Sequence, residues 1–207
     1  GENTSVVTTV NDGIAHGRFS ASGLLERKRA FIPTESSARI PSFTDFDKEL
    51  ARHAQAGGFD SIALSFVNSA DDVHEAREWL KQELNWEPYL IAKIETSGAV
   101  QNAEEIARAS DAVMVARGDL AVQGGFHNLW RLQQETLRAC QAVGTYAIVA
   151  TGFLESLHTN SFPSRSEAID IACAVDMGAQ ALMLSSETTI GPRPLEAVAA
   201  MRRLITQ

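Results

Sequence analysis

The stretch YLIAKIETSGAVQNAEEIARASDAVMVARGDL, residues 89–120, decides the fold of this chain. Residues 89–94 form a short run of aliphatic residues, which is typical of a buried strand. Residues 100–109 have the apolar spacing of a helix, and residues 111–116 form a second buried run. The stretch therefore predicts a strand, a helix and a second strand.

Charged residues lie at, or directly after, the carboxyl ends of both predicted strands. Lys93 and Glu95 share a face, because alternate residues of a strand point the same way. Arg117, Gly118 and Asp119 follow the second strand, and parallel neighbouring strands would bring both groups to one edge. Two carboxylates from separate strands suit Mg²⁺ or Mn²⁺, which prefer oxygen ligands. The spacing predicts a metal at the two carboxylates with the lysine facing a bound anion; ordinary salt bridges at strand ends are the alternative.

The composition indicates an ordinary soluble protein. The 207 residues are 44% hydrophobic and 21% charged, which is enough for one core or one and a half domains. The net charge of −8 argues against a nucleic-acid partner or an acidic membrane surface. Neither a membrane span nor a signal peptide is visible, and Cys140 and Cys173 lack the spacing of a disulfide framework. We therefore expect a cytoplasmic protein whose cysteines act as small buried hydrophobes.

Residues 1–41 differ in sequence pattern from the remainder of the chain. Two β-branched or aliphatic runs, residues 4–10 and 14–19, flank the turn signal Asn11-Asp12-Gly13 and predict a hairpin. The segment is too short to bury a core of its own. We predict that residues 1–41 are an N-terminal β-hairpin segment and that residues 42–207 are the main domain.

From residue 42 onward, predicted strands alternate with predicted helices. The strands are expected at residues 59–67, 89–94, 111–116, 145–151 and 180–184. The helices are expected to begin at the capping pairs Ser42 and Asp45, Ser69 and Asp72, and Ser164 and Glu167, with a long helix over residues 126–143 and a last one from Pro194. Alternation of this kind predicts a parallel sheet covered by helices.

Polar signatures at the strand ends favour one of two parallel architectures. In a (β/α)₈ TIM-type barrel the catalytic groups come from the carboxyl ends of several strands. A doubly wound open sheet is the competitor, but no glycine-rich phosphate fingerprint follows the first strand. We predict an α/β fold of the (β/α)₈ TIM-barrel type, partial, with five βα units.

Several segments together resemble the pyruvate kinase family. They are IAKIET at 91–96, SDAVMVARGDLAV at 110–122, IVATGFLESL at 148–157, PSRSE at 163–167 and ALMLSSETTIGPRPLEAV at 181–198. ALSFVNSADDVHEAR at 63–77 is similar in kind, and VNDG at 10–13 resembles the closing part of the family's lid domain. The resemblance implies strands 4 to 8 of the family's barrel, a lid remnant at residues 1–41, and a phosphotransferase that makes pyruvate and ATP from phosphoenolpyruvate and ADP.

The resemblance also implies roles for residues at matching positions. Lys93 matches the catalytic lysine, Glu95 and Asp119 match the two protein ligands of the divalent metal, and Thr151 matches the threonine near the enolate carbon. Residues that match the substrate-binding segment and the supporting pocket are Ala116, Arg117, Gly118, Ser65, Phe66, Ser185 and Glu187. The implied cofactor is Mg²⁺ or Mn²⁺, and the implied ligands are phosphoenolpyruvate or pyruvate, with ADP or ATP as the second substrate.

The resemblance is incomplete. The family's first three strands, which hold nucleotide phosphates and a monovalent cation, have no counterpart in the sequence, so K⁺ is expected only if those units exist elsewhere. Gly152, Ser186 and Gln123 stand where the family usually has glutamine, glycine and glutamate. Five βα units leave a barrel open, so we expect a homo-oligomer or a complementing chain to close it.

Three functions stay open at this point. The chain is one piece of a pyruvate kinase-like protein, or a Mg²⁺-dependent lyase or aldolase that handles a pyruvate enolate without nucleotide, or a non-catalytic relic that binds the ligand. Joint presence of the four implied catalytic and metal residues argues against the relic. The histidines show no ligand spacing, and Ser185-Ser186 shows no arrangement of a nucleophilic serine.

Overall fold

The computed structural model describes residues 5–19, 22 and 41–206, and the chain divides into two units, residues 1–35 and 36–207. In the first unit, β1 (Ser5–Asn11) pairs antiparallel with β2 (Ile14–Phe19). Asp12 and Gly13 join them with φ angles of 49° and 77°, the positive values that a two-residue hairpin turn requires. The residues that the sequence predicts as a hairpin therefore pair as one. The predicted boundary at residue 41 follows residues 23–40, which lie outside the described part, and it stays a prediction.

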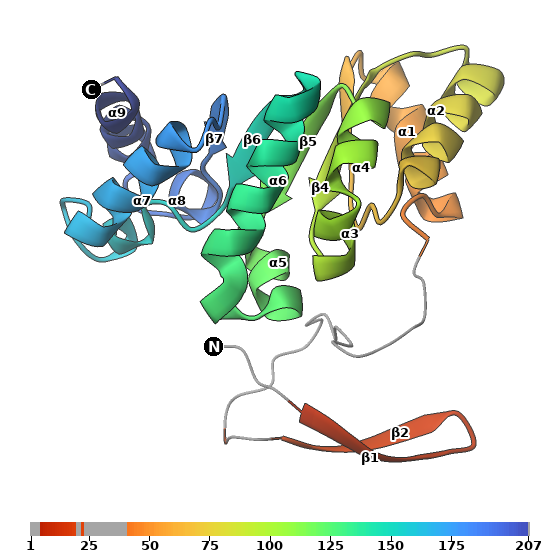
Figure 1. The fold of residues 1–207 in the computed structure, drawn as a ribbon, viewed down its shortest axis with the longest axis horizontal. Helices are drawn as coiled ribbons and strands as arrows, with labels where there is room; N and C mark the ends of the chain where they lie inside the picture. The colour runs from red at the N-terminus through yellow and green to blue at the C-terminus, as the bar shows by residue number, and fades with distance from the viewer. Residues whose placement is uncertain (1–4, 20–21, 23–40, 207) are drawn as a thin grey trace. The chain divides into compact units, whose positions relative to one another are not determined.

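The second unit is built on a sheet of five strands, which lie in chain order (Figure 1). The strands are β3 (Ser61–Leu64), β4 (Tyr89–Ile94), β5 (Ala112–Ala116), β6 (Tyr146–Ala150) and β7 (Ala181–Met183). Each strand pairs in parallel with the next. A helical crossover joins every neighbouring pair, as parallel pairing requires. The predicted alternation is confirmed.

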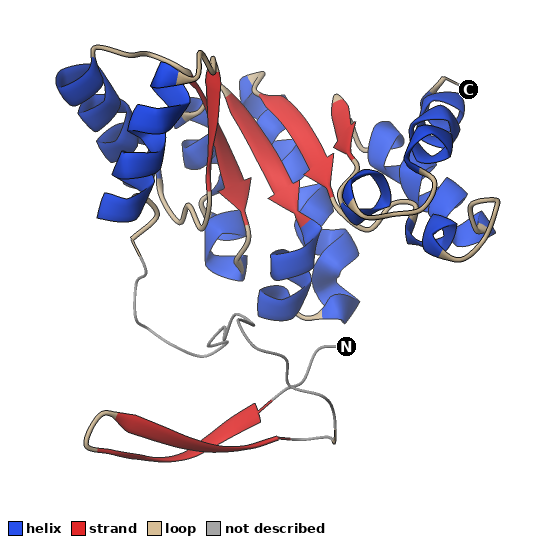
Figure 2. Cartoon of the chain, turned by 180° about the vertical axis from the view of Figure 1, so that it is seen from behind, coloured by secondary structure: helices blue, strands red, loops and turns tan. Residues whose placement is uncertain are grey.

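The helices decide between the two predicted architectures. The longer ones are α1 (Asp45–Ala56), α2 (Ala70–Leu84), α4 (Ala103–Ala109), α6 (Leu129–Val143), α7 (Arg165–Asp176) and α9 (Pro194–Ile205). Figure 2 shows β4, β5 and β6 from the other face, with no helix of the described part lying over them. A doubly wound sheet carries helices on both faces, so covering on one face confirms part of a TIM-type barrel.

Short helical turns follow the carboxyl ends of the strands. They are α3 (Ser97–Gln101), α5 (Arg117–Gly124), α8 (Ser186–Thr189) and the 3₁₀ turns η1 (Phe126–Asn128) and η2 (Glu155–His158). None of the described helices is long and apolar enough to cross a membrane.

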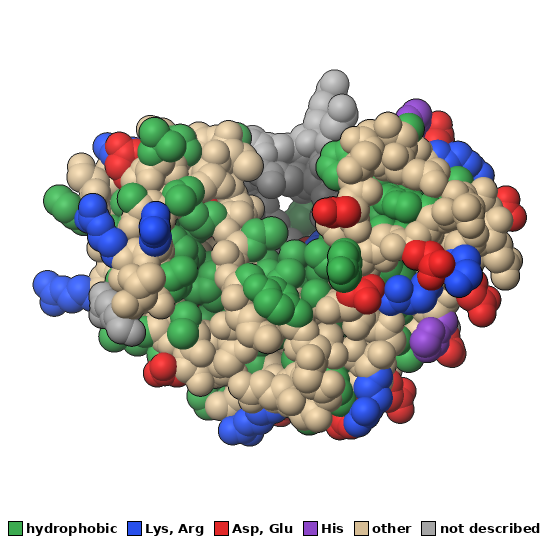
Figure 3. All heavy atoms as spheres, turned by 90° about the horizontal axis from the view of Figure 1, so that it is seen from above, with side chains coloured by type: hydrophobic (Ala, Val, Ile, Leu, Met, Phe, Trp, Pro, Cys, Tyr) green, Lys and Arg blue, Asp and Glu red, His purple; other side chains and the backbone are tan. Residues whose placement is uncertain are grey.

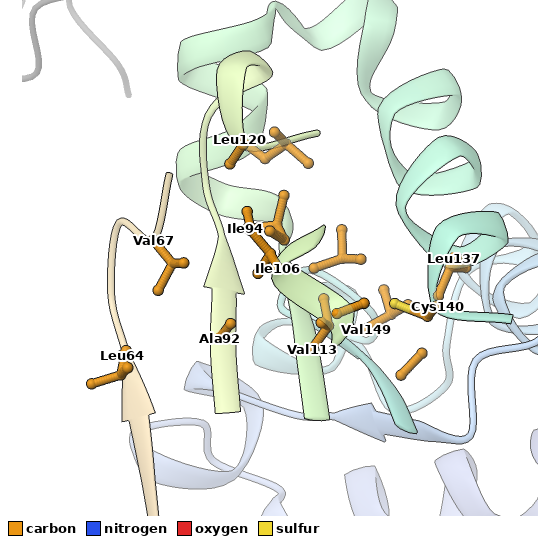
Figure 4. Packing of buried hydrophobic residues seen from close by; sticks show 14 of the residues in the cluster. Leu64, Val67, Ala92, Ile94, Ile106, Val113, Leu120, Leu137, Cys140 and Val149 are labelled. Atoms are coloured by element: carbon orange, nitrogen blue, oxygen red, sulfur yellow. The ribbon is translucent and has the colours of Figure 1, made fainter. Parts of the chain in front are cut away.

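The core lies between the sheet and its helices (Figure 4). Ile94 from β4 and Val113 from β5 pack toward Ile106 of α4, and Cys140 of α6 lies fully buried in the same cluster. Burial raises the pKa of the Cys140 thiol to about 11, so it stays protonated at neutral pH and acts as a small hydrophobe.

Alternate residues of the strands point to the face that the helices leave open. In β4, Leu90, Ala92 and Ile94 are buried, whereas Ile91 and Lys93 are partly exposed. This face is the interior of a closed barrel. Lys93 therefore projects from the interior side of the sheet, near its carboxyl end.

The two ends of the sheet differ in character. Seen from the end at which the strands begin, hydrophobic side chains gather in the middle of the surface (Figure 3). Tyr89 and Tyr146, the first residues of β4 and β6, are exposed, and so is Phe59 before β3. Polar and charged residues follow the opposite, carboxyl ends, which is where a TIM-type barrel places its site.

The predicted capping boxes of α2 and α7 are confirmed, and the one predicted for α1 is wrong. The structure places the box of α1 at Thr44 and Asp47 instead of Ser42 and Asp45. Thr44 donates its backbone N–H to Asp47 Oδ2 at 2.8 Å, while Asp47 N donates to Thr44 Oγ1 at 3.3 Å. The reason is that threonine with aspartate three residues on satisfies the same pattern two positions later.

Three predicted elements differ from the structure by more than one residue at an end. The strand predicted at residues 59–67 is confined to β3, because Gly58 and Phe66 adopt positive φ on either side of it. The helix predicted at 100–109 divides at Asn102 into α3 and α4, and the helix predicted at 126–143 begins as the turn η1.

Glu167 carries a testable contribution to stability, because it ties the start of α7 to η2. Its carboxylate accepts hydrogen bonds from Ser164 N at 2.7 Å, from Ser156 N at 2.8 Å and from Ser156 Oγ. Burial alone would raise the pKa of Glu167, but these hydrogen bonds outweigh burial and lower the pKa below its usual value. The stabilisation is therefore present above the pKa of the unfolded chain and is lost as pH falls through the native pKa.

We expect Glu167→Gln to lower the free energy of unfolding by about 1 kcal/mol at neutral pH, and by less in acid below the native pKa. Urea denaturation at the two pH values measures this. Glu196→Gln is the control, because Glu196 lies in the first turn of α9 and accepts no hydrogen bond from the described residues. An equal loss at both pH values would contradict the assignment.

Candidate functional site

The carboxyl ends of the strands lie side by side. The register pairs Leu64 with Ala92, Ile94 with Val115, and Ala150 with both Ala116 and Met183. The predicted site residues stand at these ends, in three groups: Ser65, Phe66, Lys93 and Glu95 at β3 and β4; Ala116, Arg117, Gly118 and Asp119 at β5 and α5; Thr151, Ser185 and Glu187 at β6 and β7. The topology therefore brings all of them to one rim of the sheet.

Lys93 and Glu95 contact each other, as their shared strand face predicts. Lys93 Nζ lies 2.8 Å from Glu95 Oε1 and donates to Ser65 Oγ at 3.0 Å. The Glu95 side chain is 1% exposed, and its Oε2 accepts the backbone N–H of Phe66 at 2.6 Å. A carboxylate this deeply buried requires such partners. The ion pair that was the alternative interpretation is thus present, and Lys93, 24% exposed, still reaches solvent.

Asn68 and Thr96 hold the loops after β3 and β4 together, although the sequence analysis does not single them out. Asn68 Nδ2 donates to Phe66 O at 2.7 Å, and its Oδ1 accepts from Thr96 Oγ1 at 3.0 Å. Thr96 also caps α3, accepting from Ala99 N at 3.0 Å. The network keeps Phe66, whose φ is 52°, beside Glu95. A capping residue directly after a strand was the signal available in the sequence.

Asp119 is the second carboxylate expected to bind metal. It lies in the first turn of α5, is partly buried, and forms no hydrogen bond or ion pair with the described residues. β4, which delivers Glu95, is the direct neighbour of β5, which leads into α5. The ends of two neighbouring strands thus carry one buried carboxylate and one carboxylate without a hydrogen-bond partner among the described residues, and both offer oxygen atoms as metal ligands.

These two carboxylates fit a magnesium ion. The described residues contain no group of three or more His, Cys, Asp or Glu side chains arranged to hold a metal. A metal at Glu95 and Asp119 would therefore complete its coordination with water or substrate. Mg²⁺ commonly binds through one or two carboxylates and keeps several water or substrate oxygens, whereas a structural Zn²⁺ site needs four protein ligands.

Thr151 joins the ends of three elements in a strained conformation. Its φ is 75°, which is costly for a β-branched residue. Its Oγ1 accepts from Gly118 N at 3.2 Å, and its backbone N–H donates to Met183 O at 3.2 Å. The start of α5 and the ends of β6 and β7 are thereby fixed to one another.

Arg117 turns its side chain into the protein. The side chain is only 8% exposed and lies over the ring of Phe153, with the guanidinium carbon 3.9 Å from the ring centroid. Its Nη1 donates to both carboxylate oxygens of Asp170, and its Nε donates to Thr151 O at 2.9 Å. The guanidinium is thus engaged by protein groups, so a role of Arg117 in substrate binding stays a prediction that concerns its backbone. Phe153 and Asp170 are partners that the sequence analysis missed.

Glu187 links the segments that follow β6 and β7 through buried hydrogen bonds. It is 2% exposed, and its carboxylate accepts from Ser185 N at 2.7 Å and from Leu154 N at 3.3 Å. Beside it, His158 Nε2 lies 3.1 Å from Ser186 Oγ, a contact that the scattered histidines did not predict. No carboxylate of the described residues contacts His158, so the pair lacks the third group that orients a catalytic base.

Comparison with known proteins identifies the relatives of this chain. Residues 4–198 match the family described as "Pyruvate kinase, barrel domain". The chain is 41% identical over 179 residues to pyruvate kinase isozyme G, chloroplastic, of Ricinus communis. These 179 residues cover 86% of the chain and 43% of that protein. It is 36% identical over 198 residues to pyruvate kinase of Thermoplasma acidophilum, covering 96% of the chain and 34% of the relative.

A third relative agrees with these two. Pyruvate kinase of Methanocaldococcus jannaschii is 39% identical over 170 residues, which cover 82% of the chain and 38% of that protein. The chain thus spans roughly two fifths of the length of the curated relatives that it matches. The family match covers all five strands of the parallel sheet, every predicted site residue, and the helices as far as residue 198 in α9. The chain belongs to the pyruvate kinase family.

Proposed function

We propose that this chain carries the metal and enolate half of a pyruvate kinase site, which transfers the phosphoryl group of phosphoenolpyruvate to ADP. The observation that carries the proposal is the arrangement at neighbouring strand ends. The buried Glu95 is held by Lys93 and Phe66 N, and the unpaired Asp119 follows the adjacent strand. Relatives named pyruvate kinase support this reaction over a lyase or aldolase, which no observation favours.

Glu95 and Asp119 would hold the divalent ion. The chemistry supplied by that ion, when bound, is neutralisation of negative charge on the carboxylate and enolate oxygens of the substrate. Glu95 is fixed in place before binding, since Lys93 and Phe66 N each hold one of its oxygens. Little rearrangement is then required when ligands arrive, which is how preorganised sites lower a barrier.

Lys93 would stabilise the phosphoryl group in transfer. Its ammonium projects from the interior face of the sheet and is partly open to solvent, so an anion can approach it. Phosphoryl transfer depends mainly on positioning and on neutralisation of charge, and an ammonium donates three hydrogen bonds for both.

The start of α5 and Thr151 would hold the organic part of the substrate. Backbone N–H groups at a helix start attract carboxylates, which suits the segment Ala116, Arg117 and Gly118. Thr151 Oγ1 already accepts a hydrogen bond from Gly118 N. The hydroxyl hydrogen of Thr151 is donated to no described group, so the hydroxyl could donate it toward the enolate. Ser65, Phe66, Ser185 and Glu187 would act as supporting pocket residues.

The proposal assigns no residue of this chain to ADP or to K⁺. Since the curated relatives are longer, we propose that these contacts, and closure of the barrel, come from another part of the protein, a second copy or a complementing chain. Residues 1–41 would be the remnant of a lid and its linker.

The test is release of pyruvate from phosphoenolpyruvate by the 207-residue chain with Mg²⁺, with and without ADP. Release that requires both Mg²⁺ and ADP, far above the rate of a Lys93→Met control, supports the proposal. Release that does not depend on ADP would favour an enolate enzyme without nucleotide. Absence of release in both conditions contradicts transfer by this chain alone.

A further inference from the structure

Arg117 occupies an unusual position for a charged residue. Among the described residues it is the one basic residue that is buried. It nevertheless satisfies its guanidinium on three sides: Nη1 binds Asp170 at 2.8 and 2.9 Å, Nε and Nη2 both donate to the carbonyl oxygen of Thr151, and the ring of Phe153 covers one face. Stacking on a ring and a fork of donors are properties that lysine cannot supply.

The carbonyl oxygen that Arg117 binds belongs to Thr151, a β-branched residue whose positive φ is energetically unfavourable. A threonine at φ 75° persists only when its surroundings fix it. Arg117 takes its carbonyl oxygen from one side, and the N–H of Gly118, the next residue in the chain, takes its hydroxyl oxygen from the other. The consecutive residues 117 and 118 therefore clamp both oxygens of Thr151 and set the direction of its hydroxyl.

Asp170 completes this clamp from α7. Its side chain is 39% exposed, so it faces solvent on one side and the buried guanidinium on the other. It holds Nη1 and thereby leaves Nε and Nη2 turned toward Thr151. Without its charge the guanidinium loses its anionic partner, and a buried charge that loses its partner moves toward water.

We propose that Asp170 is a positioning residue that acts through Arg117 to hold Thr151 in its left-handed conformation, with its hydroxyl directed at the reacting carbon of the enolate. This role rests on the proposed function, because it assumes that the Thr151 hydroxyl lies on the side of the enolate where the carbon is protonated. Asp170 touches no substrate, and its effect is transmitted entirely by the guanidinium.

The test replaces Asp170 by asparagine, which keeps the shape and one acceptor but removes the charge. The direct readout is the nuclear magnetic resonance signal of Thr151, in which a strong intraresidue Hα–HN Overhauser effect reports positive φ. Asp176→Asn is the matched control, since Asp176 ends the same helix, is exposed and forms no side-chain hydrogen bond or ion pair with the described residues. Arg117→Lys is the second variant, because lysine cannot bind the carboxylate and the carbonyl in the same geometry.

We expect Asp170→Asn and Arg117→Lys to move the Thr151 signal alike, with no further change in the double variant, and Asp176→Asn to leave it unchanged. We expect kcat for pyruvate formation to fall by about 10- to 100-fold in Asp170→Asn, with KM for phosphoenolpyruvate nearly constant. An unmoved Thr151 signal overturns the proposal, and so does a moved signal with unchanged kcat. A moved signal in a chain that shows no turnover upholds the linkage from Asp170 to Thr151 and contradicts only the proposed phosphoryl transfer.

Discussion

We expect Lys93→Met to lower kcat for pyruvate formation by ~10²–10³-fold or more. The variant removes the one ammonium that projects from the interior face of β4 beside Glu95. Methionine preserves the length and much of the volume of the side chain, so the loss reports charge rather than packing. Steady-state release of pyruvate with Mg²⁺ and ADP measures it.

The same variant should leave binding of the divalent ion nearly intact. In this variant Glu95 loses its ion pair with Lys93 but keeps the hydrogen bond from Phe66 N to its Oε2. A divalent cation at Oε1 would replace the positive charge of the lysine. Lys81→Met is the control, because Lys81 pairs with Glu87 on an exposed surface where both side chains are more than half exposed. Turnover of Lys93→Met at the rate of the unmodified chain would remove the role assigned to the lysine.

Asp119→Ala should abolish the binding of oxalate that depends on a divalent ion. Oxalate resembles the enolate of pyruvate, so it reports the metal and the anion site without requiring phosphoryl transfer. Asp119 is one of the two carboxylates that we propose as metal ligands, and its loss would leave Glu95 as the other. We expect affinity for oxalate in the presence of Mn²⁺ to fall by at least about 100-fold, measured by titration calorimetry.

The matched control for this experiment is Asp176→Ala, which removes an exposed carboxylate that forms no hydrogen bond or ion pair with the described residues. Far-ultraviolet circular dichroism of both variants checks that α5 and the sheet persist. If Asp119→Ala binds oxalate as tightly as the unmodified chain, the metal lies elsewhere and the assignment of Asp119 is wrong.

The order of the sheet could be predicted from sequence because few arrangements satisfy the pattern. Runs of buried residues such as residues 111–116 separated by amphipathic helices allow parallel neighbours in chain order. The contact of Lys93 with Glu95 was predictable for the same elementary reason, since alternate residues of one strand share a face. Local patterns also located the caps at Ser69 and Ser164, which depend on a residue only three positions away.

Contacts across large separations were not predictable from a single sequence. Asp170 lies 53 residues from Arg117, and nothing in either segment marks the other as its partner. The local residue pattern did not mark the helix α5, because Gly118 in its first turn is a poor helix former; only the family resemblance implied a helix start there. The positive φ of Thr151 runs against the preference of a β-branched residue, so only the surrounding hydrogen bonds reveal it. These exceptions to local preference gather at the rim of the sheet, where the proposed site lies.

We propose that Glu95 and Asp119 together bind one divalent ion at the carboxyl ends of β4 and β5. The most direct measurement is a crystal structure of the chain with Mn²⁺ and oxalate, with the metal located by its anomalous scattering. We expect one anomalous peak, with both carboxylates and oxalate oxygens as its ligands and with Lys93 beside the oxalate. A peak that leaves either carboxylate uncoordinated, or no peak at this rim, would contradict it.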